Sequence, residues 1–419
     1  MYLFALALKS LVNRRITASL TVLAIALSVT LLLGVEKMRT EAKASFANTI
    51  SGTDLIVGAR SGSIPLLLYS VFRIGNATNN IGWDSYQDIA RGLQVAWTIP
   101  LSLGDSHRGF RVLGTTSDYF EHYRYGPKRP LAFAQGGPFE DLFDAVVGAD
   151  VARELGYRPG QSIVVAHGAG AAEFSRHDDK PFRVAGILAK TGTPVDRTVH
   201  VGLEAIEAIH LDWRGGARMP GREIGPDAVC RMDLSPKVIT AFLVGLKSKT
   251  AVFAMQRRIN EYKGEPLLAV LPGVALQELW GLMGTAEAAL VAVSGFVVVT
   301  GVLGMLTMML AGMNERRREM AILRSVGARP AHIFFLFVAE AATLTALGIA
   351  LGLGLLYLAL LGIQPIVDSG YGLYIPVTPP TDRDLAVIGL VFLAGAIAGL
   401  VPAYRAYRQS LADGMIVRT

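Results

Sequence analysis

The chain has 419 residues, a mean hydropathy of +0.41 and only 18% charged residues. This composition is too apolar and too poor in charge for an ordinary soluble protein. The formal net charge of +6 needs no nucleic-acid partner, because much of the basic excess lies in short segments beside apolar runs.

Four apolar runs are long enough to cross a bilayer, which takes about 20 residues of helix. The segment between the first two runs has ordinary globular composition and the length of a domain. The sequence therefore predicts an α-helical membrane protein with four transmembrane helices, one before this inserted domain and three after it. The predicted boundaries are 1–15 for an interfacial N-terminal segment, 16–35 for the first span, 36–285 for the inserted domain, 286–313 for the second span, 314–331 for a loop, 332–361 for the third span, 362–384 for a short loop, 385–404 for the fourth span and 405–419 for a tail.

The first apolar run resembles a secretory signal in one respect, because Ala42-Lys43-Ala44 formally matches a cleavage site. A secretory core has about 7–15 apolar residues, which is shorter than this run. Glu36, Lys37 and Arg39 also separate the run from the cleavage-like site. We therefore predict an uncleaved membrane helix.

Basic residues are concentrated in three flanks of the predicted spans, namely 1–15, 314–331 and 405–419. The loop 362–384 instead carries more acidic than basic side chains. Because basic flanks favour the cytoplasmic side, we expect these three segments inside the cell and the domain 36–285 outside it. An even number of spans is consistent with that orientation.

The pattern within residues 36–285 predicts a mixed α/β domain with a helical stalk at each end. Apolar residues recur at helical spacing over 36–50 and 273–288, which indicates the stalks. We expect an exposed loop over 213–227, which is rich in Gly, Pro and Arg. The remaining predicted elements are a strand at 54–57, a helix, turn and strand over 148–166, a strand, loop, strand and helix over 182–209, and a strand and helix over 238–262.

Motifs of catalysis and cofactor binding are absent from the sequence. There is no GxxxxGK[ST] phosphate loop, no HExxH, no CxxC and no GxSxG. We therefore expect no catalytic, cofactor-binding or metal site in this chain. The single cysteine, Cys230, cannot form an intramolecular disulfide, and a small buried thiol is the expected state.

The histidines raise one alternative, a membrane-anchored metal-binding protein. His177-Asp178-Asp179 could contact a metal, but a solvated turn is the expected structure. The histidines of the inserted domain are dispersed along the sequence, and none shares a helix face with another ligand, which argues against this alternative. They are His107, His122, His167, His177, His200 and His210.

The loop 314–331 combines a dense charged patch with an apolar face. Met320, Leu323 and Val326 recur at three-residue spacing, which predicts a short amphipathic helix. Gly327 can end this helix before Pro330 turns the chain into the third span. A topological anchor needs only basic residues, so the interleaved apolar face favours docking of a cytoplasmic partner.

The same loop resembles the coupling region of permeases in the superfamily of macrolide exporters (MacB), lipoprotein-releasing permeases (LolC/LolE) and the cell-division permease FtsX. Those sequences carry a pattern Arg-Arg-Arg-Glu-x-x-x-x-Arg-x-x-Gly-Ala, which is matched here by Arg316, Arg317, Arg318, Glu319, Arg324, Gly327 and Ala328. Glu340 occupies the family's acidic position in the third span. The segment 402–410 is similar to the family's C-terminal end, whereas 411–419 departs from it.

The resemblance implies a permease subunit of an ATP-binding-cassette complex in a bacterial inner membrane, with the large domain in the periplasm. Its partners would be a cytoplasmic ATPase that carries ATP and Mg²⁺, a second permease copy and a periplasmic protein or lipoprotein; a homodimer is favoured over a heterodimer. In MacB the ATPase precedes the first span. Only fifteen residues do so here, so we expect a separate ATPase chain. Residues implied in coupling to it are Glu315, Arg316, Arg317, Arg318, Glu319, Met320, Leu323, Arg324, Val326, Gly327 and Ala328.

The family's proposed mechanism is mechanotransmission, in which ATP-driven motion of the coupling helices reaches the periplasmic domain through the stalks. The predicted spans suit this mechanism, because Glu287 and Glu340 are their main ionisable residues and both lie near span ends. An alternative is a transmitter that regulates a periplasmic hydrolase without transport. Replacing Met320 or Leu323 by Asp is expected to uncouple ATPase stimulation.

Two pairs of small residues indicate close helix packing. Gly348 and Gly352 are four residues apart in the third span, and Gly395 and Gly399 are four apart in the fourth. We expect these glycines to pack helices within one subunit rather than across a dimer seam.

Overall fold

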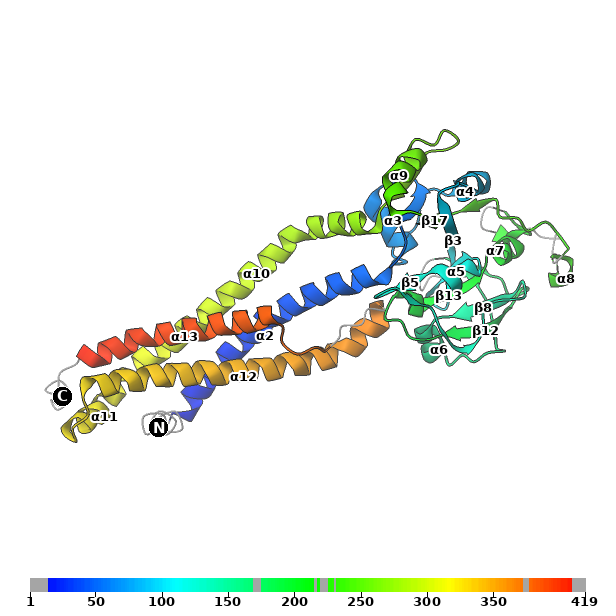
Figure 1. Ribbon diagram of the computed structural model, residues 1–419. Coiled ribbons are helices and arrows are strands. Elements are labelled where there is room, and N and C mark those ends of the chain that lie inside the picture. Colours follow the sequence, from blue (N-terminus) through cyan, green and yellow to red (C-terminus); the bar gives the residue numbers. More distant parts are fainter. Residues whose placement is uncertain are drawn as a thin grey trace. The chain divides into compact units, whose positions relative to one another are not determined.

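The computed structural model describes residues 14–168, 175–214, 217–218, 225–229, 231–371 and 377–408. The chain divides into two compact units, shown together in Figure 1. A helical unit takes its described residues from 1–41, 284–365 and 376–419. An α/β unit takes its residues from 42–283 and 366–375. Cys230 and most of the predicted N-terminal and C-terminal segments lie outside the described residues.

Among the described residues, four helices are long and apolar enough to cross a membrane. Their most apolar windows have a mean hydropathy of 2.3 to 2.4. The four helices are α2 (Arg15–Thr49), α10 (Pro272–Ala311), α12 (Pro330–Tyr371) and α13 (Asp382–Arg408), and the shorter α11 (Met313–Ser325) lies between α10 and α12.

These helices are longer than the apolar spans identified in the sequence. Helix α2 continues through 36–49, and α10 begins fourteen residues before the predicted second span. The segment 362–384, predicted as a loop, is helical as far as Tyr371 and again from Asp382. The extensions of α2 and α10 match the helical stalks predicted over 36–50 and 273–288, which a hydropathy window alone would miss because these extensions are amphipathic.

The ends of α2 and α10 that extend beyond their apolar windows are packed into the α/β unit. Ala275 and Leu276 belong to its largest core cluster, and Phe46 packs against that cluster. The rings of Phe46 and Trp280 meet edge to face with centroids 5.4 Å apart. Burial of these side chains is the physical reason that both helices continue into this unit.

The α/β unit is built on a mixed sheet, as the sequence predicted. Within the described residues twelve strands join, in the order β18-β1-β17-β3-β4-β13-β8-β12-β7, with β10 beside β3, β11 beside β10 and β9 beside β12. Strand pairs β4–β13 and β8–β12 are parallel, and the others in this sheet are antiparallel. The strands are β1 (Leu55–Ala59), β3 (Val95–His107), β4 (Phe110–Thr115), β7 (Phe133–Gly136), β8 (Asp144–Val147), β9 (Ser162–Ile163), β10 (Ala166–His167), β11 (Ser175–Arg176), β12 (Phe182–Leu188), β13 (Thr198–Gly202), β17 (Ala241–Leu246) and β18 (Leu267–Val270).

Short strand pairs and helices complete this unit. The pairs are β2 (Ile81–Gly82) with β16 (Val238–Ile239), β5 (Arg124–Tyr125) with β6 (Arg129–Pro130), and β14 (Trp213–Arg214) with β15 (Ala217–Arg218). The helices are α3 (Ser63–Ser70), α4 (Trp83–Ala90), α5 (Asp118–His122), α6 (Ala149–Leu155), α7 (Leu203–His210), α8 (Pro226–Val229) and α9 (Val252–Asn260), with 3₁₀ turns at Pro194–Arg197 and Lys249–Ala251.

The predicted order of elements over 148–166, 182–209 and 238–262 is confirmed. Residues 213–227 were predicted to form a loop. Their described part instead includes the β14–β15 pair and the short helix α8, and the rest lies outside the described residues.

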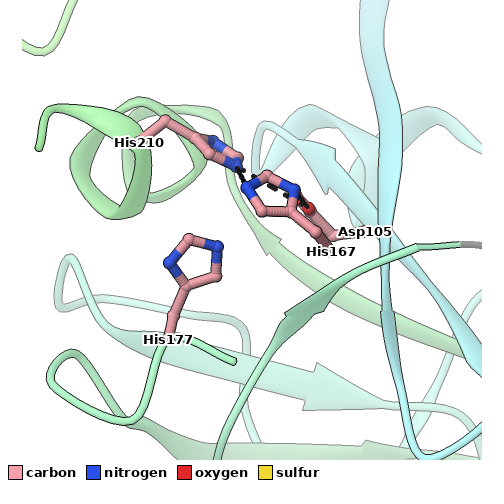
Figure 2. Close-up of side chains that lie close together, drawn as sticks. All are labelled: Asp105, His167, His177 and His210. Carbon is pink, nitrogen blue, oxygen red and sulfur yellow. Dashed lines mark hydrogen bonds and ion pairs between the residues drawn. The ribbon is translucent and has the colours of Figure 1, made fainter. Parts of the chain in front are cut away.

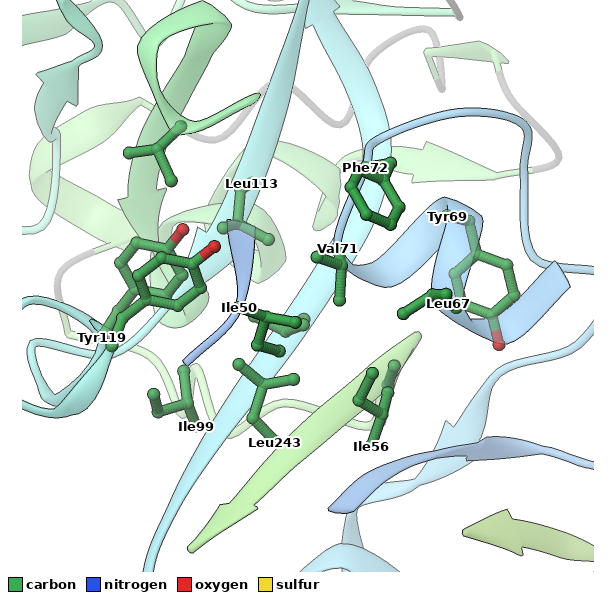
Figure 3. Close-up of a cluster of buried hydrophobic side chains, with 14 of the residues drawn as sticks. Ile50, Ile56, Leu67, Tyr69, Val71, Phe72, Ile99, Leu113, Tyr119 and Leu243 are labelled. Carbon is green, nitrogen blue, oxygen red and sulfur yellow. The ribbon is translucent and has the colours of Figure 1, made fainter. Parts of the chain in front are cut away.

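Strand β3 is the element that joins the two halves of the sheet. Its thirteen residues pair with β17 as far as Leu101 and with β4 from Ser102 onward. Figure 3 shows the apolar cluster beside it, where Ile56 of β1, Ile99 of β3 and Leu243 of β17 lie together. Two further buried clusters pack on the same sheet. Strand β3 therefore connects the strands on both of its sides into one sheet.

His200 lies at the centre of β13 and is completely buried. Its ring contacts Tyr119, with centroids 5.1 Å apart, and its Nδ1 lies 3.2 Å from the Val146 carbonyl oxygen. Burial, reinforced by the charge of Arg73, lowers the pKa of His200 to about 3. The ring is therefore neutral in the folded protein at all ordinary pH values.

Because His200 is neutral when folded, we expect the free energy of unfolding to fall as the pH is lowered. The unfolded chain takes up a proton below about pH 6.5 and the folded chain does not, so lowering the pH from about 7.5 to about 5.5 costs roughly 1.4 kcal/mol from this residue. The melting temperature of the full chain in detergent should fall accordingly. His200→Gln should flatten that dependence and His332→Gln should not; an unchanged slope in the first variant would contradict the assignment.

Candidate coupling site

Helix α11 is the charged helix predicted between the second and third spans. The chain leaves it through a left-handed residue, Gly327, whose φ is 104°. The Gly327 N–H donates to the Arg324 carbonyl at 3.1 Å, and the Ala328 N–H donates to the Leu323 carbonyl at 2.9 Å. This pair of bonds is a Schellman motif, in which glycine avoids the penalty that a Cβ would meet. The prediction that Gly327 ends the helix is confirmed, and α12 begins at Pro330.

A buried ion pair fixes α11 to α12. Arg316 Nη1 lies 2.5 Å from Glu340 Oε2, and the two side chains are only 5% and 4% exposed. The Arg316 guanidinium also lies over the Phe337 ring, with Cζ 4.5 Å from the centroid. Glu319 adds a weaker contact, because its Oε2 is 3.8 Å from Arg316 Nε and its side chain is exposed.

The ion pair shows that Arg316 and Glu340 lie in a different environment from the one that the sequence indicated. Arg316 was assigned to a patch that faces a partner, and Glu340 was assigned only to the start of the third span. The structure places both inside the helical unit, in contact with each other. Sequence spacing missed the pair because Arg316 and Glu340 lie on different helices, 24 positions apart.

The apolar face of α11 is divided between interior and surface. Met320 is only 7% exposed, so in this structure it packs inside the helical unit and is not placed to contact a partner directly. Leu323 is half-buried. Ile322 and Val326 are 61% and 82% exposed. Replacing Met320 by Asp would therefore disturb the packing of this chain itself, and the exposed Ile322 is the better-placed contact residue.

The other predicted coupling residues surround this surface. Glu319 and Gly327 are exposed, whereas Arg317, Arg324 and Ala328 are half-buried. The structure gives no description of the side chains of Glu315 and Arg318.

The four glycines predicted to pack helices do so within this chain. A Cβ on Gly348 would lie 2.6 Å from Ile25 of α2, and one on Gly352 would lie 2.7 Å from the Ala26 carbonyl. Thr30 Oγ1 donates to the Gly352 carbonyl at 2.9 Å, so α2 and α12 also share a hydrogen bond. Cβ atoms on Gly395 and Gly399 of α13 would collide with Thr345 and Ala341 of α12. All four contacts lie within one chain, in agreement with the expected packing inside one subunit.

A second polar cluster of the helical unit lies where α2 leaves its apolar window. Lys37 is 6% exposed, and its Nζ donates to the Thr378 carbonyl and hydroxyl, both at 2.8 Å. Glu36 pairs with Arg383 at 3.0 Å, and Arg39 lies 3.5 Å from Glu287. Sequence analysis used these charges only to exclude signal cleavage. Their partners lie on α10 and around the start of α13, so local sequence carries no sign of them.

The histidines of the α/β unit are less dispersed than the sequence indicated. His177 is completely buried, which corrects the prediction of a solvated turn. Potential metal-binding atoms of Asp105, His167, His177 and His210 lie within 4.8 Å of one another. Burial, with the nearby His210 and His167, lowers the pKa of His177 to about 4. The argument from dispersed positions is therefore wrong, since strand pairing brings these residues together.

Comparison with known proteins gives the family. The sequence model of the MacB-like periplasmic core domain matches residues 18–262, and that of the FtsX-like permease C-terminal region matches residues 291–411. The first match alone covers more than half of the chain. This chain belongs to the MacB/FtsX-type family of ATP-binding-cassette transporter permeases.

Individual relatives are distant. The chain is 24% identical to the macrolide export ATP-binding/permease protein MacB of Nitrobacter winogradskyi over 425 residues, which covers 97% of this chain and 60% of that protein. It is 22% identical to the protein of the same name from Bdellovibrio bacteriovorus over 383 residues, covering 86% and 55%. The chain thus spans less than two thirds of the length of these curated relatives.

Two solved structures resemble part of the chain. The periplasmic region of MacB from Actinobacillus actinomycetemcomitans aligns with 55% of this chain and 94% of that one, with a TM-score of 0.34 and 11% identity. The extracellular domain of the noncanonic ABC-type transporter YknZ from Gram-positive bacteria aligns with 52% and 99%, with a TM-score of 0.31 and 11% identity.

The buried ion pair predicts an asymmetry between single and double substitutions. Glu340→Leu alone leaves the Arg316 guanidinium buried without its partner, which costs about 3–5 kcal/mol. The double variant Arg316→Met and Glu340→Leu removes both charges and should recover most of this loss. Melting temperatures of the purified full chain measure the effect.

Glu319→Gln is the control, because the Glu319 side chain is 59% exposed and its contact is long. It should change stability by less than about 1 kcal/mol. A double variant as unstable as Glu340→Leu would show that the pair does not act as a unit.

Proposed function

We propose that this chain is the membrane component of an ATP-driven complex in a bacterial inner membrane, and that it transmits motion from a cytoplasmic ATPase to its own α/β unit. The observation that carries the proposal is the buried Arg316–Glu340 pair. A helix held by such a pair cannot rotate or slide without breaking it, so force applied to α11 is passed to α12.

The proposed docking surface is the exposed side of α11 around Ile322 and Val326. These two apolar side chains are 61% and 82% exposed and lie next to charged residues. Apolar surface of this kind is more favourable in contact with a protein partner than in contact with water. The partner is a cytoplasmic ATP-binding-cassette ATPase on a separate chain, which supplies ATP and Mg²⁺. The family membership of the chain supports an ATPase as the partner, without deciding whether it is a separate chain.

Transmission to the α/β unit would use the long helices. Helices α2 and α10 each extend past their apolar windows, and their ends form part of the packing of the α/β unit. Continuous helices are stiff along their axes, so they suit a mechanical link. Under the positive-inside rule, the basic flanks favour a cytoplasmic α11 and a periplasmic α/β unit.

The cargo would be handled by the α/β unit outside the bilayer, with export or extraction as the result. The most apolar part of each span favours this route over a polar pore, because ionisable residues are concentrated near the helix ends. A second permease copy and a periplasmic protein or lipoprotein would complete the complex. The glycines that pack α2, α12 and α13 together are used within one chain, so a dimer would need another surface.

The test is co-purification of the full chain in nanodiscs with its ATPase, followed by ATP hydrolysis. Ile322→Asp and Val326→Asp should each raise the ATPase concentration needed for half-maximal stimulation by about 10-fold or more, because a charge is placed in an apolar contact. Stability of the chain should be unchanged, since both side chains are exposed.

Leu93→Asp is the matched control, because Leu93 is 90% exposed but belongs to the α/β unit. It should leave stimulation unchanged. Equal stimulation by all three variants would remove the docking assignment. A stable complex that hydrolyses ATP but moves no cargo would favour the transmitter that regulates a periplasmic hydrolase.

A further inference from the structure

Four side chains with metal-binding atoms meet at one edge of the α/β unit. Antiparallel pairing of β10 with β3 places His167 directly opposite Asp105. Strand β3 carries a β-bulge against β4 between Leu103 and Ser106, so Asp105 lies in the bulge. Bulges redirect side chains and are frequent beside functional sites. His210 is the last residue of α7. His177 directly follows β11, and Ser175 of that strand pairs with His167.

The contacts within this group are short, as Figure 2 shows. His167 Nδ1 lies 3.0 Å from Asp105 Oδ1, and His210 Nε2 lies 3.1 Å from His167 Nε2. His210 Nε2 is also 3.7 Å from Asp105 Oδ1. The ring of His177 lies beside both other imidazoles, with centroids 4.8 Å from His167 and 5.2 Å from His210.

Hydrogen bonding leaves these nitrogens poorly satisfied without an ion. His210 Nδ1 lies 2.6 Å from the Ile206 carbonyl, which can only accept, so Nδ1 carries the proton and a neutral His210 has a bare Nε2. By the same reasoning, His167 Nδ1 donates to Asp105, and a neutral His167 also has a bare Nε2. Two lone pairs then face each other at 3.1 Å.

A second proton on His167 would relieve that contact but would not satisfy His177. Both nitrogens of His177 are buried, and neither has a hydrogen-bond partner among the described residues. The side chain is fully inaccessible to solvent. A buried imidazole without any partner is costly, and two further imidazoles beside it are the usual surroundings of a metal ligand.

We propose that His167, His177, His210 and Asp105 form a binding site for a divalent transition-metal ion, with Zn²⁺ the ion that best suits the donor set. Three imidazoles and one carboxylate match the nitrogen and oxygen ligands of tetrahedral zinc. Nitrogens at about 2.0–2.1 Å from a tetrahedral ion lie about 3.3–3.4 Å apart, close to the observed 3.1 Å between the two Nε2 atoms.

The surroundings supply the second shell of such a site. The Ile206 carbonyl holds the tautomer of His210, which is the role that outer carbonyls play around metals. The side chains of His167 and His210 are 25% and 28% exposed, so an ion can enter from that side. The neighbouring cation, Lys180, is paired with Asp212 at 2.6 Å.

The site would join parts of the chain that are distant in sequence. Asp105, His167, His177 and His210 belong to β3, β10, the segment after β11 and α7. A bound ion would cross-link these elements and stabilise the folded unit by mass action. The proposal goes beyond the coupling function and does not depend on it.

The experiment uses the full chain, purified in detergent with a tag free of histidine and stripped with a chelator. Calorimetric titration with Zn²⁺ should give one ion per chain, and that ion should remain bound after desalting. The melting temperature should rise with added Zn²⁺. Replacement by Co²⁺ should give the intense visible absorption of a four-coordinate site.

Two substitutions separate ligation from folding. His177→Phe keeps a ring to pack on Trp213, whose centroid is 4.4 Å away, but removes both nitrogens. Asp105→Asn keeps the shape but removes the charge. Each should weaken Zn²⁺ binding by about 10-fold or more. His332→Ala, which removes an exposed histidine of α12, should bind Zn²⁺ like the unchanged chain.

The fluorescence of Trp213 can report metal binding at the site itself. Its ring also lies 4.9 Å from that of His167, so bound Cu²⁺ or Ni²⁺ should quench its fluorescence. Trp213→Phe should abolish this quenching and still bind Zn²⁺. The proposal is overturned if the unchanged chain retains no Zn²⁺, or if His177→Phe and Asp105→Asn bind it as tightly as His332→Ala does.

Discussion

The buried pair of Arg316 and Glu340 is the interaction that holds α11 against α12. Removing two charges from water is expensive, and their 2.5 Å contact and the Phe337 ring offset much of that cost. The pair therefore tolerates neither loss of one partner nor much separation. Helix α11 is consequently held on α12 in one position, while Ile322 and Val326 remain on the surface.

The same unit has polar contacts where α2 leaves its apolar window. Lys37 reaches Thr378, and Glu36 reaches Arg383, so α2 is connected to the segment that starts α13. Between these contacts and the Arg316–Glu340 pair, close approach at Gly348 and Gly352 lets α2 lie against α12. Close backbone packing in the middle and charged contacts near the ends therefore connect α2 both with α12 and with the segment that starts α13.

The α/β unit combines a rigid sheet with one group of unsatisfied side chains. Strand β3 connects both halves of the sheet, and its bulge directs Asp105 toward His167 and His210. Natural folds rarely bury an imidazole such as His177 without a partner, so this group marks a place where packing alone does not explain the residues. A cross-link there would stiffen the end of the sheet formed by β10 and β11.

Sequence by itself determined the features that depend on local pattern. Apolar runs predicted the four long helices, and alternating strand and helix patterns predicted the mixed α/β class. The Gly-Ala-Arg-Pro segment after Val326 predicted the end of α11. These follow from hydropathy, periodicity and the freedom of glycine at positive φ, which neighbouring residues decide. Tertiary structure alone decided that Arg316 and Met320 face inward, that Lys37 meets Thr378, and that His167, His177 and His210 meet. Each of these depends on which distant segments pack or pair, and spacing along one chain carries no information about that.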